Sequence, residues 1–188
     1  MFNDSIRFVA QSIEKTTVNE INSCYYQKYI NFFPSDLLKK LITIPSNVKF
    51  EKLEHQENRS RLRVSYSEMI SKELNVIFRS SKITKMLEEK FNQKLTPGTA
   101  DIWYDYTDYS LSPHRDDPRV KLAIQIYLDS NDNPGTVLYD SVEKSNVIET
   151  FPYILNSGYS LLNSEKSFHG TEGKVKQKTR KSVYIRYS

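Results

Sequence analysis

The chain has three histidines, His55, His114 and His169. Of these, His114 and His169 lie in sequence patterns suited to chemistry. His114-Arg115-Asp116 is an H-x-D pattern, and residues two apart in a strand point to the same face, roughly 7 Å apart along it. An imidazole and a carboxylate can therefore converge on one metal ion. The pattern also arises by chance, and the alternative is a polar pair at a strand edge.

His169, which lies between Phe168 and Gly170, could add a third ligand from a distant strand. Two imidazoles and one carboxylate occupy one face of an octahedral ion and leave three positions open. This donor set suits non-haem Fe(II) and the oxygenases that use it. Taken alone, His169 also fits a surface histidine in a loop.

The C-terminal segment offers a receptor for an anion. Arg180 and Ser182 fall on one face of a strand, and Val183, Ile185 and Tyr187 fall on the other. A planar guanidinium beside a hydroxyl binds a carboxylate well. The pattern indicates a small acid that is chelated at one end and held by Arg180 at the other. The alternative is that Arg180 is one exposed charge of the basic run 174–181.

In their order along the chain, these motifs resemble the Fe(II)/2-oxoglutarate-dependent dioxygenase superfamily, and within it the prolyl-hydroxylase-like branch. After H-x-D come the strand Ile126-Tyr127-Leu128-Asp129, the turn and strand 135–139, the tripeptide Phe168-His169-Gly170, and R-x-S. The resemblance covers residues 99–188, about half of the chain. It implies a double-stranded β-helix, or jelly roll.

The resemblance also assigns roles to the polar residues already described. His114, Asp116 and His169 match the iron ligands. Arg180 matches the residue that pairs with the distal carboxylate of 2-oxoglutarate, and Ser182 matches its helper. We therefore expect Fe(II) as the metal, 2-oxoglutarate and O2 as co-substrates, and ascorbate as an auxiliary reductant.

Several tyrosines extend the expected site. The resemblance implies that Tyr127 assists at the distal carboxylate and that Tyr104 lines the co-substrate site, although the residues around Tyr104 lack the glycine usual there. Tyr106 and Tyr109 lie just ahead of H-x-D and are candidates for the substrate wall, as is Arg115.

The implied reaction hydroxylates a C–H bond of a peptide (prolyl-type) or a small molecule and releases succinate and CO2. Two other classes of protein stay open at this point. One is a non-catalytic metal-binding jelly-roll module, and the other is a zinc-dependent hydrolase, for which R-x-S would have no purpose. The net charge of +4 disfavours a nucleic-acid partner.

The elements that must position these residues can be read from periodicity. Helices are expected after Pro34, with Ser35 as the cap, after the capping-box pattern 65–68, and after Ser80-Ser81. Strands are expected at 25–30, 48–53, 120–129, 136–139, 147–151, 159–162 and 180–187. The expected class is α+β, a jelly roll with N-terminal helices packed on one sheet.

Length and composition agree with this class. The 188 residues suit one domain, with 1–98 as a mainly helical supporting region and 99–188 as the jelly-roll core. Cys24 is the only cysteine, which excludes a disulfide framework. No segment reads as a membrane span or a signal peptide, and we expect a cytoplasmic protein. The sequence does not predict the oligomeric state.

Overall fold

The computed structural model describes residues 2–44, 47–51, 60–143, 146–176 and 179–188. Its helices are α1 (Phe2–Lys15), α2 (Ser35–Ile42), α3 (Met69–Phe78) and α4 (Ser81–Phe91). Its strands are β1 (Asn19–Ile21), β2 (Cys24–Ile30), β3 (Phe50–Glu51), β4 (Arg61–Val64), β5 (Pro97–Tyr106), β6 (Leu122–Tyr127), β7 (Thr136–Tyr139), β8 (Val147–Phe151), β9 (Ser157–Leu162), β10 (Phe168–Thr171) and β11 (Thr179–Tyr187).

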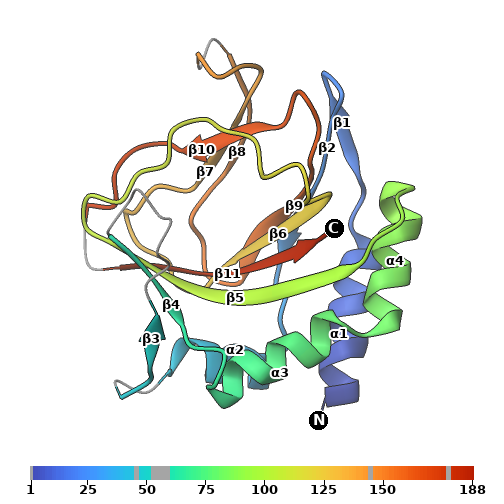
Figure 1. Cartoon of the computed structure of the whole chain (residues 1–188), viewed down its shortest axis with the longest axis vertical. Helices are drawn as coiled ribbons and strands as arrows, with labels where there is room; N and C mark the ends of the chain where they lie inside the picture. Colours follow the sequence, from blue (N-terminus) through green and yellow to red (C-terminus); the bar gives the residue numbers. More distant parts are fainter. Residues whose placement is uncertain (1, 45–46, 52–59, 144–145, 177–178) are drawn as a thin grey trace.

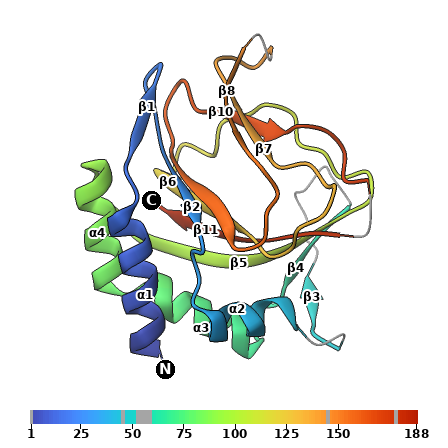
Figure 2. The same ribbon diagram turned by 180° about the vertical axis from the view of Figure 1, so that it is seen from behind.

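The strands form two antiparallel sheets. The large sheet has eight strands in the order β1-β2-β9-β6-β11-β5-β4-β3, and the small sheet has three in the order β10-β7-β8. Figure 1 shows the helices on one side of the curved large sheet and the small sheet on its other side, and Figure 2 shows the same layers from behind. The mixed helix-and-sheet class predicted from the sequence is confirmed.

Alternation along the strands divides the large sheet into two faces. In β6, Leu122, Ile124 and Ile126 belong to the core beneath the helices, whereas Tyr127 belongs to a second cluster next to the small sheet. β11 alternates in the same way, because Val183 and its alternate neighbours join the helix-side core. The opposite face of both strands is therefore available to line a site between the sheets.

The helices cover the apolar face of the large sheet. α1 packs its buried stripe, Val9, Ala10 and Ile13, against α4 and α3, and α3 packs against β5. The resulting core draws on both halves of the chain and includes Phe32, Phe78, Leu74, Leu87, Ile102, Ile124 and Ile185. This core fixes the large sheet as the base on which the site is built.

The two helix caps predicted from the sequence, at Ser35 and at 65–68, are not observed. The cap that is observed is Ser80 at α4, whose hydroxyl accepts a hydrogen bond from the backbone N–H of Ile83. α2 begins at Ser35 with Pro34 in the N-cap position, and neither α2 nor α3 has a side-chain cap. The predicted capping box is wrong because the Ser65 hydroxyl instead donates to Glu51.

The N-terminal half contributes more to the large sheet than its composition indicates. β1 to β4 all join it, and β4 pairs directly with β5 at the edge of the later site. The predicted strand at 48–53 is observed only as β3, and its end lies outside the described residues, as does His55. None of the described helices has the length and apolar character required to cross a bilayer.

Candidate metal centre and anion receptor

A cavity of about 290 Å³ lies between the two sheets. Its walls come from β4, β5, β6, β9 and β11 of the large sheet, from β7 and β10 of the small sheet, and from the loop between β5 and β6. The lining includes His114, Asp116, His169 and Arg180. The structure therefore gathers in one cavity the three residues that the sequence assigned to metal binding and the arginine that it assigned to anion binding.

A short backbone bridge brings the two histidines together. The backbone N–H of His114 donates to the carbonyl of His169 at 3.0 Å, and the reverse bond measures 2.8 Å. Gly170 makes this approach possible, since a Cβ there would lie 2.5 Å from the carbonyl oxygen of Leu111. The imidazole rings are consequently held with their centroids 4.6 Å apart.

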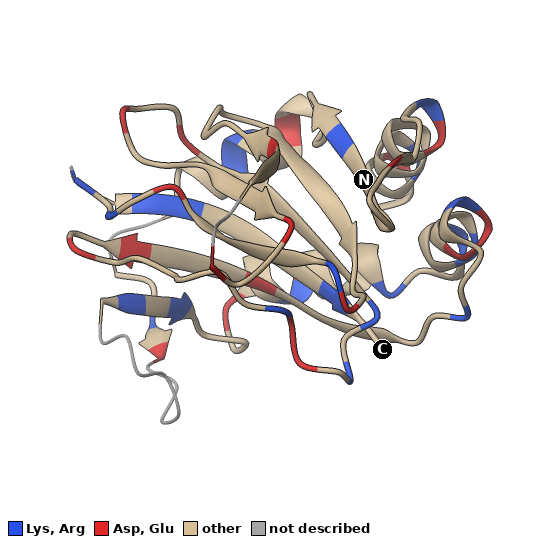
Figure 3. Cartoon of the chain, turned by 90° about the horizontal axis from the view of Figure 1, so that it is seen from above, with Lys and Arg blue, Asp and Glu red and all other residues tan. Residues whose placement is uncertain are grey.

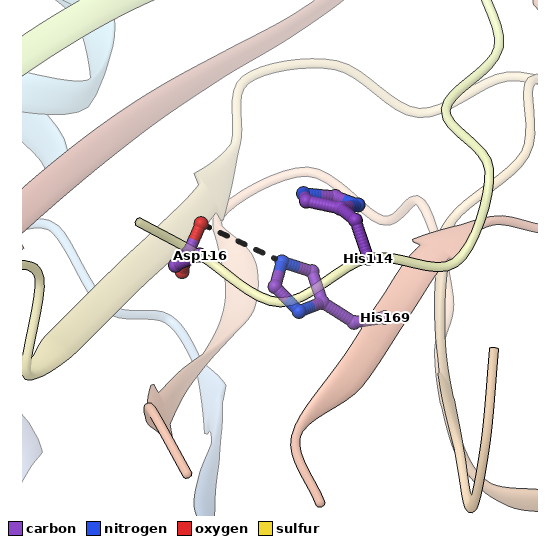
Figure 4. Close-up of side chains that lie close together, drawn as sticks. All are labelled: His114, Asp116 and His169. Carbon is purple, nitrogen blue, oxygen red and sulfur yellow. Dashed lines mark ion pairs between the residues drawn. The ribbon is translucent and has the colours of Figure 1, made fainter. Parts of the chain in front are cut away.

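The ligand atoms of His114, Asp116 and His169 all lie within 4.8 Å of one another. Figure 4 shows the three side chains converging, with His169 on a strand and the other two on the neighbouring loop. His169 Nε2 is 3.9 Å from Asp116 Oδ1. These separations allow one small ion to reach all three groups, because ligand atoms around such an ion lie roughly 3 Å apart when each is about 2.1 Å from it.

Hydrogen bonds fix which nitrogen each imidazole presents. His114 Nδ1 lies 3.0 Å from the carbonyl of Ser112, and His169 Nδ1 lies 3.0 Å from the carbonyl of Ser167. A carbonyl only accepts, so each Nδ1 carries the proton and each Nε2 keeps its lone pair. Burial and the nearby His169 lower the pKa of His114, which favours the neutral ring that a metal requires.

The carboxylate ligand is oriented by β11. The Tyr184 hydroxyl donates a hydrogen bond to Asp116 Oδ1 at 2.8 Å. Burial, together with the Asp116 carboxylate, raises the pKa of Tyr184 well above its ordinary value, so the hydroxyl remains a donor. Two oriented imidazoles and an oriented carboxylate fit a divalent ion with N and O preferences, and this set suits non-haem Fe(II).

Arg180 lies in the same cavity and is 1% exposed. Its Nε donates to the carbonyl of Pro134 at 2.9 Å and its Nη2 donates to the hydroxyl of Thr136 at 3.2 Å. Its Nη1 donates to Asp105 Oδ2 at 2.8 Å. The guanidinium is therefore held rigidly by groups from β5, β7 and the preceding turn, while N–H groups remain for a ligand.

Two charged residues near Arg180 were not identified by the sequence analysis. Asp105 is 0% exposed and binds both Arg180 and Arg61. Arg61 comes from β4, and its guanidinium lies over the rings of Tyr109 and Trp103, at 4.3 and 5.0 Å from their centroids. The alternation of side chains along a strand would have placed Asp105 and Trp103 on one face. The sequence around Arg61, by contrast, carries no signal that Arg61 pairs with Asp105, which lies more than forty residues further along the chain.

The structure does not bring Tyr104 or Tyr106 into the cavity. Both lie on the helix-facing side of β5, Tyr104 within the core and Tyr106 packed against it. The physical reason is strand alternation, because the cavity face of β5 carries Trp103 and Asp105 instead. The expected role of Tyr104 at the co-substrate is corrected accordingly, and Tyr106 does not form a wall of this cavity.

Tyr127 and Ser182 are buried beside the cavity without lining it. The Tyr127 hydroxyl donates to Thr136 at 2.8 Å, and its ring lies 5.1 Å from the Arg180 guanidinium. The Ser182 hydroxyl accepts a hydrogen bond from Gln125, which does line the cavity. In this structure both residues therefore contact groups that form the cavity wall.

The two remaining substrate candidates have different positions. Tyr109 lines the cavity, and burial raises its pKa to about 12. Arg115 is exposed and its guanidinium lies 5.6 Å from the ring of Phe168. Arg115 borders a neighbouring surface depression that also includes Asp116 and Asn163, so it lies outside the main cavity.

No protein-family model matches the chain, and no curated protein matches its sequence. Solved structures do match. An oxidoreductase of the 2OG-Fe(II) oxygenase family from Burkholderia pseudomallei has a TM-score of 0.59 at 14% identity, covering 97% of this chain and 89% of that one. A prolyl hydroxylase from Trichoplax adhaerens, in complex with a hypoxia inducible factor oxygen degradation domain peptide fragment, has a TM-score of 0.62 at 14% identity, covering 97% and 88%.

A third similar structure is the non-heme alpha ketoglutarate dependent epimerase SnoN from nogalamycin biosynthesis. It has a TM-score of 0.62 at 9% identity, covering 97% of this chain and 82% of that one. The chain therefore has the fold that these proteins share, as the sequence resemblance predicted. Since that fold carries both a hydroxylase and an epimerase, the reaction has to be argued from the site.

Proposed function

Starting from this shared fold, we propose that the protein is an Fe(II)- and 2-oxoglutarate-dependent oxygenase. The observation that carries the proposal is the convergence of His114, Asp116 and His169 in one cavity with a buried arginine. A zinc or structural metal site accounts for the first three residues alone. The arginine is explained when the metal is shared with a ligand that ends in a carboxylate.

In this proposal His114, Asp116 and His169 hold the iron. When bound, Fe(II) would supply the redox chemistry that couples the oxidative decarboxylation of 2-oxoglutarate to oxidation of a substrate C–H bond. The residues of the chain orient the metal-binding groups and control what enters the cavity. The carbonyls of Ser112 and Ser167 keep both imidazoles in the ligating tautomer, and the inter-sheet position limits access of water.

Arg180 is proposed to receive the distal carboxylate of 2-oxoglutarate. Tyr127 supports this position through Thr136, because the Thr136 hydroxyl accepts from both the Tyr127 hydroxyl and Arg180 Nη2. Ser182 supports the neighbouring wall through Gln125. A guanidinium held on three sides is preorganised for an anion, so less entropy is lost when the ligand binds.

The proposed substrate is a peptide or a small molecule whose C–H bond is hydroxylated with release of succinate and CO2. The Trichoplax adhaerens structure holds a peptide fragment, which supports the peptide class for this fold. Tyr109 is the substrate-wall candidate that reaches the cavity, and Arg115 is proposed to contact substrate outside it. Positive and negative residues are intermixed over the described elements in Figure 3, which supports the view that nucleic acid is not the substrate.

We also propose a single domain in which the two sheets form the double-stranded β-helix. The support is the shared core, to which residues before 98 and after 99 both contribute, and the cavity enclosed between the sheets. On this view residues 99–188 carry the metal and co-substrate groups and residues 1–98 support them, with the addition that β4 reaches the site through Arg61.

The test is formation of succinate from 2-oxoglutarate in the presence of Fe(II), ascorbate and O2, together with direct measurement of iron binding. Asp116→Ala should abolish iron binding, because two neutral imidazoles alone hold Fe(II) weakly. Arg180→Ala should raise the 2-oxoglutarate concentration needed for half-maximal turnover by at least about tenfold while sparing iron binding.

Asp117→Ala is the matched control for Asp116→Ala, since Asp117 pairs with exposed Arg119 and should leave iron binding unchanged. The two alternatives give different results. A non-catalytic metal module binds iron but yields no succinate with or without added substrates, and a zinc-dependent hydrolase yields none and is active with zinc. Absence of succinate under all these conditions contradicts the oxygenase proposal.

A further inference from the structure

Arg61, Asp105 and Arg180 form a row across three neighbouring strands. Asp105 on β5 is in register with Arg61 on β4 and with Arg180 on β11. Arg61 donates to both carboxylate oxygens, at 2.5 Å from Nε to Oδ1 and 3.1 Å from Nη2 to Oδ2. Arg180 donates to Oδ2 at 2.8 Å. One buried carboxylate is thus shared by two guanidinium groups.

The net charge of this row of three residues determines how strongly the cavity attracts an anionic ligand. Arg180 and Asp105 alone form a neutral pair, which attracts an anion only weakly. Arg61 adds one positive charge. It is partly buried and contacts the fully buried Asp105 carboxylate, where charges interact more strongly than in water because the effective dielectric constant is lower. The row as a whole therefore carries one net positive charge at the inner end of the cavity.

A second observation at the same cavity points to a ligand that accepts hydrogen bonds. The indole N–H of Trp103 is buried and has no acceptor among the described residues, although Trp103 lines the cavity and is 5% exposed. Buried donors rarely remain without a partner in a folded protein. A carboxylate in this region would meet a surplus of donors and of positive charge.

We propose that Arg61 is a positioning residue for the co-substrate. By binding Asp105, it leaves Arg180 with a net positive charge for the distal carboxylate of 2-oxoglutarate. This inference rests on the proposed function and adds to it a residue from the N-terminal half of the chain. Arg61 acts through Asp105 and need not touch the ligand.

The test is a double-mutant cycle of Arg61 and Asp105, in which the affinity for 2-oxoglutarate is measured for each variant. The Kd for 2-oxoglutarate is determined by calorimetry on the full chain loaded with Fe(II) under argon, so that no turnover occurs. Arg61→Gln makes the row neutral and should weaken binding about tenfold, or ~1.4 kcal/mol. Asp105→Asn raises the net charge of the row to two positive charges and should bind more tightly than the wild type. The double variant restores one positive charge and should return to within about twofold of the wild type.

Arg63→Gln is the matched control. Arg63 lies on the same strand and pairs with Glu51 and Asp101, neither of which lines the cavity, so its loss should leave the Kd unchanged. Arg61→Gln removes the ion pair between Arg61 and the buried Asp105 carboxylate and can lower stability, so the melting temperature of each variant is measured. If Arg61→Gln does not fold, the comparison of Asp105→Asn with the double variant still decides, because the former should bind more tightly.

The outcomes separate the two proposals. Wild-type protein that binds no 2-oxoglutarate contradicts the proposed function, and this inference with it. Wild-type binding that is weakened alike by Arg61→Gln and Asp105→Asn, with no recovery in the double variant, leaves the proposed function intact and overturns the charge-balance role. A structural role alone predicts that second pattern, because both single changes break the same contacts.

Discussion

At the scale of single residues, the site depends on groups that orient other groups. Both imidazoles are held at Nδ1 by backbone carbonyls, and Asp116 is held by the hydroxyl of Tyr184. Such partners restrict each ligand to one tautomer or one direction before the metal arrives, so less entropy is lost on binding. Removal of one partner should therefore weaken metal binding while the ligands themselves remain.

Tyr184→Phe tests this dependence. The change keeps the ring and removes the hydrogen bond to Asp116 Oδ1, so Fe(II) affinity should fall about 10- to 100-fold. Competition with a metal-sensitive fluorescent chelator measures the affinity. Tyr187→Phe is the control, because Tyr187 is on the same strand but donates to the carbonyl of Phe78 in the helix-side core. Equal losses in both variants would show that the effect is not specific to the metal centre.

The sequence identified the cluster of two histidines and an aspartate, but missed charged residues packed beside it. His114, Asp116 and His169 share a cavity as expected, since ligand chemistry narrows the choice of residue types. Tyr104 was expected at the co-substrate from the family resemblance, whereas strand alternation turns it toward the helices. Asp105 and Arg61 were missed because their pairing joins strands that are distant in sequence.

At the scale of elements, the junction of the β5–β6 loop with β10 decides whether the two histidines meet. The bridge between His114 and His169 requires close backbone approach at Gly170. β10 was not among the strands read from periodicity, because its four residues Phe168–Thr171 carry little periodicity. By contrast, β7 and β8 were predicted with their observed bounds, and β7 directly follows the turn residues Asn131-Asp132-Asn133-Pro134-Gly135.

Gly170→Ala should disrupt this junction. Its new methyl group would lie 2.5 Å from the Leu111 carbonyl oxygen, so the loop must move, at a cost of about 1–3 kcal/mol in the free energy of unfolding. Fe(II) affinity should fall together with stability, as measured by denaturant unfolding and metal titration. Gly173→Ala is the control, because nothing lies within 4 Å of the added methyl group. An unchanged metal affinity in Gly170→Ala would contradict the role given to this contact.

At the scale of the whole molecule, the large sheet separates support from chemistry. One face packs against the helices and is almost entirely apolar, and the other carries the charged and hydrogen-bonding groups of the cavity (Figures 1 and 2). The class and the packing of helices on one sheet followed from local periodicity. The strand order did not, because pairs such as β2 with β9 and β4 with β5 depend on contacts between distant segments that no local pattern encodes.

The central claim is that a single iron ion and a single keto acid occupy this cavity together. It is tested most directly by a crystal structure of the protein with Fe(II) and N-oxalylglycine, a non-reacting analogue of 2-oxoglutarate, using anomalous scattering at the iron edge. We expect one iron peak, about 2.0–2.2 Å from His114 Nε2, His169 Nε2 and an Asp116 oxygen, with the far carboxylate of the analogue on Arg180. Iron bound elsewhere, or an analogue that turns away from Arg180, would contradict the account.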